Sequence, residues 1–210
     1  MVDFFVQGGG FMWPILIALL FGLAIIGERA YSLINSSSNT DQFFDDVKTV
    51  YDDSGKEQAI ELCENTPGPV ASIFYAGLSK MEKTKEEIEK AVQNAGGLEM
   101  AFLEKNMIWI NSVITIAPML GFTGTVVGMI KAFEDIKMAN DISPAVVAGG
   151  ISQALLTTAF GLIVAIPTLG AFIFLNNTVK KIIDEIDQYS VKLQNLLVSR
   201  GKGAQSPLER

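Results

Sequence analysis

Histidine is absent from the 210-residue sequence, and cysteine occurs only once, at Cys63. Without histidine, the chain has neither a Ser-His or Cys-His nucleophile pair nor a histidine proton relay, and it lacks the commonest metal ligand. A single cysteine excludes an intrachain disulfide and a cysteine-rich metal site. The sequence also contains no glycine-rich phosphate loop. We therefore expect no enzymatic activity, no bound metal and no cofactor.

Charge is missing from two long stretches, residues 106–130 and 145–175. At ~1.5 Å per residue the second would form a helix roughly 46 Å long, which exceeds the ~30 Å hydrocarbon core of a bilayer. A third apolar stretch covers residues 11–34, and hydrophobic residues make up 49% of the chain. The net charge of −7 lies mostly in the remaining regions and does not suggest a nucleic-acid partner. The sequence predicts an all-α membrane protein with three transmembrane helices.

Lysine and arginine are distributed unevenly around these stretches. Residues 1–10 contain neither, the segment between the second and third spans has only Lys137, and the regions after the first and third spans are rich in lysine. The positive-inside rule then places the N-terminus outside and the C-terminus in the cytoplasm. The expected order is an external segment with a flexible glycine run (1–10), a first span (11–34), a cytoplasmic helical domain (35–105), a second span (106–133), an external loop (134–144), a third span (145–175), a cytoplasmic C-terminal helix (176–200) and a tail (201–210) that is either disordered or a non-native remnant.

The cytoplasmic domain is predicted to consist of helices that extend from the membrane and bundle against the continuation of the third span. Pro67-Gly68-Pro69 is predicted to interrupt helical structure before one of these helices. A capping box formed by Thr84 and Glu87 begins another, which is expected to run through Phe102 directly into the second span. The pair Gly96-Gly97 weakens that continuity.

Each of the second and third spans has one face of small and hydroxyl-bearing residues. In the third span this face contains Gly150, Gln153, Ala154, Thr157, Thr158, Gly161, Val164, Ala165 and Thr168, and in the second it contains Ala117, Gly121, Gly124, Thr125, Gly128 and Ala132. Such faces allow close helix packing, which is their more common role, or they line a polar path. The two faces are expected to pack against each other or to line a shared cavity. Pro118 is expected to kink the second span.

Threonine hydroxyls can pass a proton along, but they cannot store one near neutral pH. If these faces line a proton path, the titratable carboxylate must therefore come from a partner. Glu28 and Arg29 end the first span. They are expected to lie at the membrane interface with their charges in water, the alternative being a functional intramembrane ion pair.

Two motifs, IAPMLGFTGTVVGMI at 116–130 and GISQALLTTAFGL at 150–162 followed by AIP at 165–167, resemble the MotA/TolQ/ExbB proton-channel family. Gly68-Pro69 and Glu28-Arg29 resemble that family too. Three spans with an external N-terminus are similar to the ExbB/TolQ branch, because flagellar MotA-type stators have four. The similarity covers about residues 11–197.

The resemblance implies a subunit of the bacterial inner membrane, with its N-terminus in the periplasm, that forms a ring of about five copies. The second and third spans would face the lumen. The ring would enclose helices of an ExbD- or TolR-like single-span partner whose intramembrane aspartate carries the proton. Ion flow would then drive work on the cell envelope, with a TonB- or TolA-like protein and lipid as further partners. The alternatives are a sodium-driven, MotA-like stator subunit and a structural membrane scaffold without ion conduction. A secondary transporter is disfavoured because the chain has no inverted repeat.

Site residues transfer only in part. Thr158 matches the family's pore threonine, whereas the threonine that some members carry before Ala-Pro falls on Ile116, one step from Thr115. Gln153 stands where many members have glutamate, and Thr125 is a candidate from geometry alone. The predicted ion-path residues are Thr158, Thr125, Thr115, Thr157 and Gln153, and the predicted helix-packing residues are Gly121, Gly124, Gly128, Gly161 and Pro118.

Overall fold

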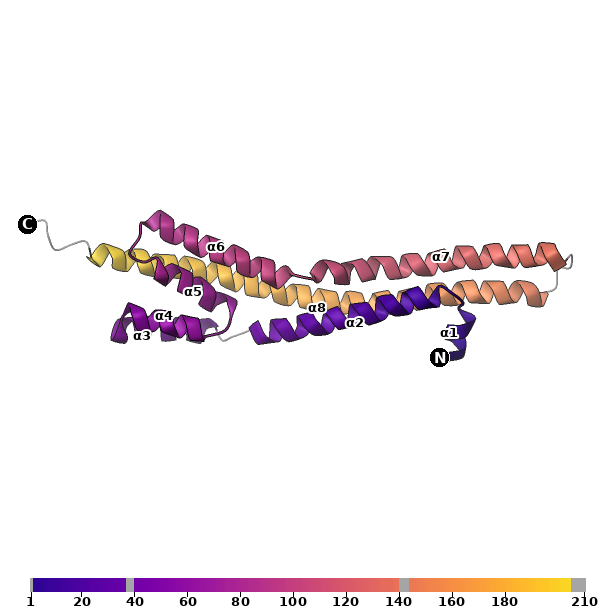
Figure 1. Ribbon diagram of the computed structural model, residues 1–210, viewed down its shortest axis with the longest axis horizontal. Coiled ribbons are helices and arrows are strands. Elements are labelled where there is room, and N and C mark those ends of the chain that lie inside the picture. Colours follow the sequence, from indigo (N-terminus) through magenta and orange to yellow (C-terminus); the bar gives the residue numbers. More distant parts are fainter. Residues whose placement is uncertain (1, 37–39, 140–143, 205–210) are drawn as a thin grey trace, which may run out of the picture. The chain divides into compact units, whose positions relative to one another are not determined.

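The computed structural model describes residues 2–36, 40–139 and 144–204, and every regular element within these ranges is an α-helix (Figure 1). Helices α2, α7 and α8 are long and apolar enough to cross a membrane. The predicted all-α membrane class is therefore confirmed. The helices are α1 (Val2–Gln7), α2 (Met12–Ser36), α3 (Thr40–Ser54), α4 (Lys56–Asn65), α5 (Pro69–Ser79), α6 (Lys85–Glu104), α7 (Met107–Ala139) and α8 (Pro144–Ala204).

The chain divides into two compact units. The membrane unit contains Met1–Arg29 and Asn106–Leu175, and the polar unit contains Ala30–Lys105 and Asn176–Arg210. Helix α8 is continuous through the boundary and extends to Ala204, so helical structure continues beyond the predicted C-terminal helix at 176–200. The predicted tail from residue 205 onward, and residues 140–143 of the predicted external loop, lie outside the described residues.

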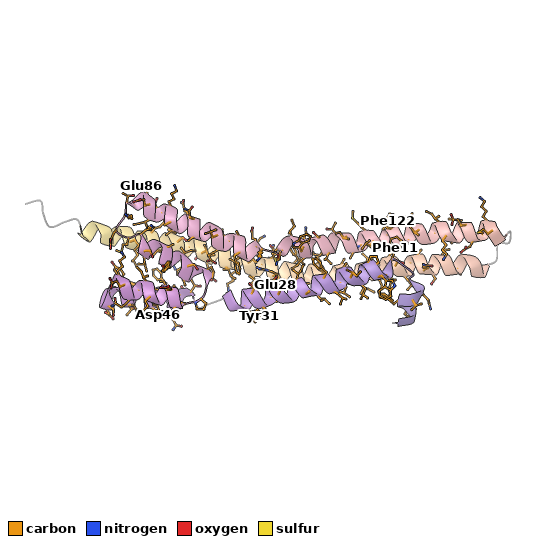
Figure 2. All side chains as sticks on the ribbon, viewed as in Figure 1. Phe11, Glu28, Tyr31, Asp46, Glu86 and Phe122 are labelled. Carbon is orange, nitrogen blue, oxygen red and sulfur yellow. The ribbon has the colours of Figure 1, made fainter. Side chains whose placement is uncertain are left out.

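The membrane unit is held together by apolar packing among α2, α7 and α8. Ile15, Val113, Ala117 and Val164 form its buried core, with Leu19 and Phe160 among the partly buried side chains around them. Other apolar side chains point away from this core, and Phe122 is one example on α7 (Figure 2). At most 28% of each apolar window is buried by the chain itself. The remaining surface needs lipid or other protein around it.

In the polar unit, α3, α5 and α6 contact the C-terminal part of α8, and α4 packs on α3 and α5. Gly77 on α5 marks the closest approach, because a Cβ there would lie 2.8 Å from a methyl of Leu193 and 3.1 Å from one of Val92. Gly68 precedes α5 with φ of 134°, a conformation that favours glycine, and the predicted break at Pro67-Gly68-Pro69 is confirmed. The predicted bundle against the continuation of the third span is also confirmed.

The beginning of α6 follows the prediction, whereas its end does not. Thr84 and Glu87 form the expected reciprocal capping box. The predicted direct continuation into the second span is wrong, because α6 ends at Glu104 and Asn106 adopts φ of 63° before α7 begins. Asparagine tolerates this left-handed conformation better than most residues. Gly96-Gly97 remains within α6, and Gly96 lies against Ile186.

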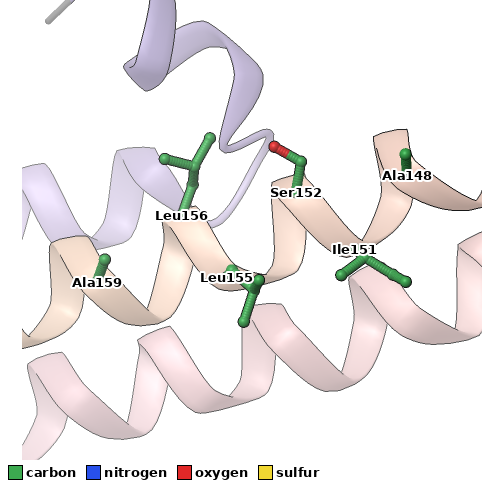
Figure 3. Close-up of a pocket in the computed structure, with 6 residues that line it drawn as sticks. All are labelled: Ala148, Ile151, Ser152, Leu155, Leu156 and Ala159. Carbon is green, nitrogen blue, oxygen red and sulfur yellow. The ribbon is translucent and has the colours of Figure 1, made fainter.

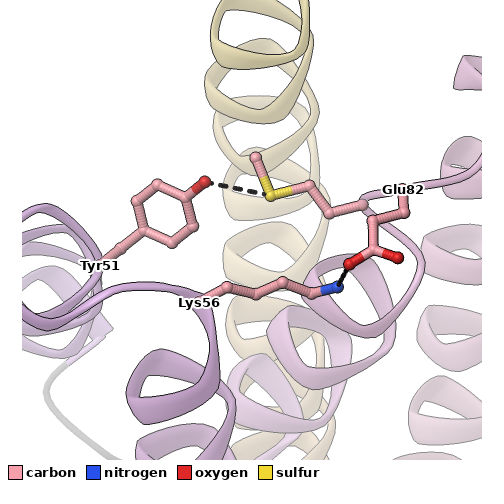
Figure 4. A network of polar contacts seen from close by, with 4 residues as sticks. Tyr51, Lys56 and Glu82 are labelled. Atoms are coloured by element: carbon pink, nitrogen blue, oxygen red, sulfur yellow. Dashed lines mark hydrogen bonds and ion pairs between the residues drawn. The ribbon is translucent and has the colours of Figure 1, made fainter. Parts of the chain in front are cut away.

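Polar contacts stabilise the ends of the polar unit. The Tyr51 hydroxyl donates a hydrogen bond of 3.3 Å to the sulfur of Met81, and Lys56 Nζ lies 2.8 Å from a carboxylate oxygen of Glu82 (Figure 4). The hydrogen bond and charge of Lys56 lower the pKa of Glu82.

Burial raises the pKa of the Cys63 thiol to about 12, so this thiol is not a nucleophile at neutral pH.

The α3–α8 contact brings acidic and aromatic groups together. The Tyr189 hydroxyl donates a hydrogen bond to Asp41, and this bond, together with burial, raises the pKa of Tyr189 to about 12. The Thr40 hydroxyl donates to Glu185 at 3.0 Å, and the Lys192 ammonium lies 4.0 Å from the centre of the Tyr189 ring. These interactions fix α3 against the helix that continues from the third span.

Candidate ion path and helix interface

The small faces of α7 and α8 face each other, as the sequence predicts. A Cβ on Gly161 would lie 2.7 Å from the carbonyl oxygen of Ala117, and one on Gly121 would lie 3.0 Å from the Thr157 carbonyl oxygen. Farther along, the space beside Gly128 is filled by Ala154, 3.2 Å away. These are backbone-to-backbone approaches that only very small side chains permit. The packing role is thus observed for Gly121, Gly128 and Gly161.

Two predicted ion-path residues meet across this interface. The hydroxyls of Thr125 on α7 and Thr158 on α8 are hydrogen-bonded to each other. Thr125 Oγ also lies 3.0 Å from the Ala154 carbonyl oxygen, and Thr158 Oγ lies 3.2 Å from the Gly121 carbonyl oxygen. Both threonines are half-buried. The pair therefore has two hydroxyls and two carbonyl oxygens in one small polar patch between two otherwise apolar helices.

Thr157 has a different environment, although it is adjacent to Thr158 in the chain. Its side chain is buried, and its hydroxyl is 3.1 Å from the Gly8 carbonyl oxygen and 2.9 Å from the Gln153 carbonyl oxygen. A Cβ on Gly124 would overlap the Thr157 side chain. Successive residues of a helix point 100° apart, which separates the two threonines. Thr157 thus connects α8 to the N-terminal segment and does not join the hydroxyl pair.

Gln153 also lies against the N-terminal segment. A Cβ built on Gly9 would overlap the Gln153 amide. Residues 8–10, expected to be a flexible glycine run, form a turn in which the Gly8, Gly9 and Met12 amides donate to Phe4, Val6 and Gly9. Gly9 has φ of 74°, where residues with a Cβ are disfavoured. The sequence contained one signal of this turn, the three consecutive glycines, but nothing that located its docking surface.

This turn gives a testable stability prediction. Gly9→Ala places a Cβ at positive φ beside Gln153, and a left-handed alanine costs roughly 1–2 kcal/mol. We expect amide hydrogen exchange at Gly8 and Met12 to accelerate by roughly 5–30-fold. Gly10→Ala is the matched control, because a Cβ there meets no atom within 4 Å. Equal exchange rates in the two variants would show that the turn does not need glycine at position 9.

The remaining predicted residues lie apart from the hydroxyl pair. Thr115 is exposed and donates to the Asn111 carbonyl oxygen at 3.0 Å. Pro118 is half-buried within α7. Glu28 accepts a hydrogen bond of 3.2 Å from Asn106. Arg29, which the sequence suggested would reach for water, is only 1% exposed and lies 3.8 Å from Glu28. The expectation of an interfacial charge in water is therefore wrong for Arg29.

An apolar groove of about 600 Å³ runs along the N-terminal part of α8. It is lined by Ala148, Ile151, Ser152, Leu155, Leu156 and Ala159. Figure 3 shows that these side chains all come from α8, with Ser152 and Leu156 toward the turn after α1. A large apolar surface left uncovered beside a helix interface is typical of contact with lipid or another protein.

Titratable groups are missing from the hydroxyl pair's surroundings. Residues 106–130 and 145–175 contain no acidic or basic side chain, so none of the pair's neighbours on α7 and α8 can hold a proton near neutral pH. Among the described residues, no group of three or more His, Cys, Asp or Glu side chains could hold a metal ion. The chemistry available here is hydrogen bonding by hydroxyls and carbonyl oxygens.

Residues 65–188, more than half of the chain, match the MotA/TolQ/ExbB proton channel family. The chain belongs to this family. It is 31% identical over 164 residues to a putative biopolymer transport protein, ExbB-like 3, of Synechocystis, a match that covers 77% of this chain and 78% of the relative. The ExbB-like chain is also 27% identical over 187 residues to a putative ExbB homologue of Methanothermobacter thermautotrophicus, covering 89% of this chain and 66% of the relative.

A third relative, the biopolymer transport protein ExbB of Neisseria gonorrhoeae, is 34% identical over 109 residues. That match covers 52% of the ExbB-like chain and 50% of the Neisseria protein. The family match includes all of α7 and residues 144–188 of α8, and therefore the hydroxyl pair and the packing glycines. The family predicted from the two motifs and the ExbB-like branch predicted from the three spans are thus confirmed.

Proposed function

We propose that the ExbB-like chain is the proton-conducting subunit of an energy-transducing motor in the bacterial inner membrane. The observation that carries this proposal is the Thr125–Thr158 pair, a half-buried pair of hydroxyls between two uncharged helices. Hydroxyls both donate and accept hydrogen bonds, so they can relay a proton or bind the acid that carries it. The family membership supports the same function.

The position of the pair fits a lumen-facing surface. Ile15 of α2 belongs to the same buried cluster as Val164 of α8, and the N-terminal turn covers Thr157. The face of α8 that carries Thr157 and Val164 is therefore occupied within one subunit. Thr158 shares a different face of α8 with Leu155 and Leu162, which are 63% and 44% exposed. We infer that this second face surrounds the lumen of a ring, for which five copies is our working number.

The acid must then be supplied by a second protein. Our candidate is an ExbD/TolR-like single-span helix whose intramembrane aspartate docks beside Thr158, with a TonB- or TolA-like protein receiving the work. A proton on that aspartate could be exchanged through the hydroxyl pair without any charge residing on α7 or α8. The lysine distribution supports a periplasmic N-terminus and a cytoplasmic C-terminus.

A structural scaffold is the second candidate, because most of the small face of α8 is used for packing within one chain. Thr157, Ala154 and Thr168 are all buried there. A scaffold predicts an assembly that forms normally and conducts nothing. A sodium-driven stator is the third, since hydroxyl and carbonyl oxygens bind hard cations as well as protons.

Ion flux in vesicles separates these candidates. The chain is reconstituted with the single-span protein, and internal pH and Na⁺ are followed under an applied membrane potential. We expect proton uptake that requires both proteins and disappears when the partner's intramembrane aspartate is replaced by asparagine. Flux of Na⁺ without H⁺ would instead support the stator alternative. A stable complex with no flux of either ion would support the scaffold.

A further inference from the structure

The N-terminal turn encloses a second pocket, of about 360 Å³, in the membrane unit. Its walls come from the turn and the beginning of α2, from one face of α7, and from a single side chain of α8. The lining residues are Gly8, Gly10, Phe11, Pro14, Gly124, Val127, Gly128, Lys131 and Gln153. The proposed ion path does not use this pocket, because Thr125 and Thr158 are not among its lining residues.

Glycines line two sides of the pocket. Gly124 and Gly128 lie in the α7 wall, and Gly8 and Gly10 lie in the turn. Of these four, Gly10 is the one where a Cβ would meet no atom within 4 Å. Phe11, Pro14 and Val127 make the rest of the surface mostly apolar. An elongated apolar molecule fits these walls better than a small hydrated ion.

Lys131 supplies the charge that selects the occupant. It is the first charged residue after the uncharged run 106–130, and its side chain is exposed. Within the described part of the chain, no carboxylate lies within ion-pair distance of Lys131; Glu134 and Asp135 follow it on α7, near the end of the helix. The Gln153 amide adds a neutral hydrogen-bonding group to the lining. A ligand with an anionic head and an apolar tail matches this combination.

The pocket also lies where two of the apolar runs begin or end. It adjoins the beginning of α2, where the span Met12–Ile34 starts, and the end of the uncharged run of α7. Trp13 is exposed there and makes an edge-to-face contact with Phe5, with ring centres 5.4 Å apart. Exposed tryptophan is typical of the membrane–water interface. We propose that this pocket binds one anionic phospholipid, with its phosphate at Lys131 and an acyl chain along Phe11, Pro14 and Val127.

Lipid retention measured by native mass spectrometry tests this proposal. The purified, delipidated oligomer is titrated with phosphatidylglycerol or with phosphatidylcholine of the same chain length. We expect one phosphatidylglycerol per subunit to bind in preference to phosphatidylcholine. Lys131→Gln should weaken phosphatidylglycerol binding about fivefold, the effect of removing one lysine from an anionic lipid surface. Lys137→Gln, on the same helix but outside the pocket, should leave it unchanged.

A second pair of variants tests the pocket walls independently of charge. Gly10→Phe should reduce or abolish lipid binding, because Gly10 lines the pocket and a Cβ there meets no atom within 4 Å. Gly27→Phe is the matched control, because Gly27 lies on α2 outside the pocket and a Cβ there also meets no atom within 4 Å. Equal binding of the two lipids, equal effects at Lys131 and Lys137, or full retention in Gly10→Phe would each overturn the proposal. None of these outcomes depends on whether the protein conducts protons.

Discussion

Gly161→Leu is expected to force α7 and α8 apart and to prevent the membrane unit from assembling. A Cβ at Gly161 would be 2.7 Å from the Ala117 carbonyl oxygen and 3.2 Å from the Gly121 Cα. Both are backbone atoms, so no change of rotamer can relieve the overlap, and the helices themselves must move. Overpacking of a buried site typically costs about 1–3 kcal/mol, and we expect at least the upper value here.

The measurement is thermal unfolding and size-exclusion chromatography in detergent. Gly170→Leu is the matched control, since it lies on the same helix and a Cβ there meets nothing within 4 Å. The same change in intrinsic helix propensity therefore applies to both variants. We expect Gly170→Leu to elute and unfold like the unaltered protein, and Gly161→Leu to aggregate or to unfold at a lower temperature. Two equally stable variants would mean that the α7–α8 contact does not hold the unit together.

This close contact is the part of the site that could be predicted from the sequence. Small residues recur every three to four positions on both helices, and no other face of either helix would allow backbones to approach so closely. That spacing predicts which faces meet, and the structure then pairs Gly121 with Gly161 and Gly128 with Ala154. The family resemblance added which helices to compare, but the contact itself is a matter of volume.

The separate environments of Thr157 and Thr158 could not be predicted in the same way. Both belong to the small polar face, and the helical wheel alone does not say which part of that face α2 and the N-terminal turn will cover. The deciding interaction joins Thr157 to the Gly8 carbonyl, 149 residues away in the chain. A backbone carbonyl leaves no pattern in a sequence, so a contact of this kind is invisible before the fold is known.

The errors at the end of α6 and at Arg29 have similar causes. Glycine lowers helix stability only modestly, and α6 continues through Gly96, which lies against Ile186. Asn106 breaks the helix instead, with its side chain donating to Glu28, a partner 78 residues away. Arg29 is a long side chain with apolar stem atoms, and its burial depends on neighbours that hydropathy does not reveal.

Thr158→Val is expected to reduce partner-dependent proton flux strongly while the oligomer still forms. Valine keeps the branched shape but removes the hydroxyl, so Thr125 loses the Thr158 hydroxyl and keeps the Ala154 carbonyl oxygen as a partner. A typical hydrogen bond contributes ~0.5–1.5 kcal/mol, and a barrier raised by ~1.4 kcal/mol slows a step about tenfold. We therefore expect the proton flux to fall by roughly tenfold in vesicles that also contain the single-span protein.

Thr157→Val is the matched control, because it makes the same chemical change at the adjacent residue. Thr157 donates to the Gly8 carbonyl oxygen and not to the hydroxyl pair, so its loss should speed hydrogen exchange in the N-terminal turn and leave proton flux unchanged. Thr158→Ser, which restores a hydroxyl on a smaller side chain, should recover much of the flux. If Thr158→Val conducts normally, or if the two valine variants lose flux equally, the hydroxyl pair is not the path and the interface serves packing alone.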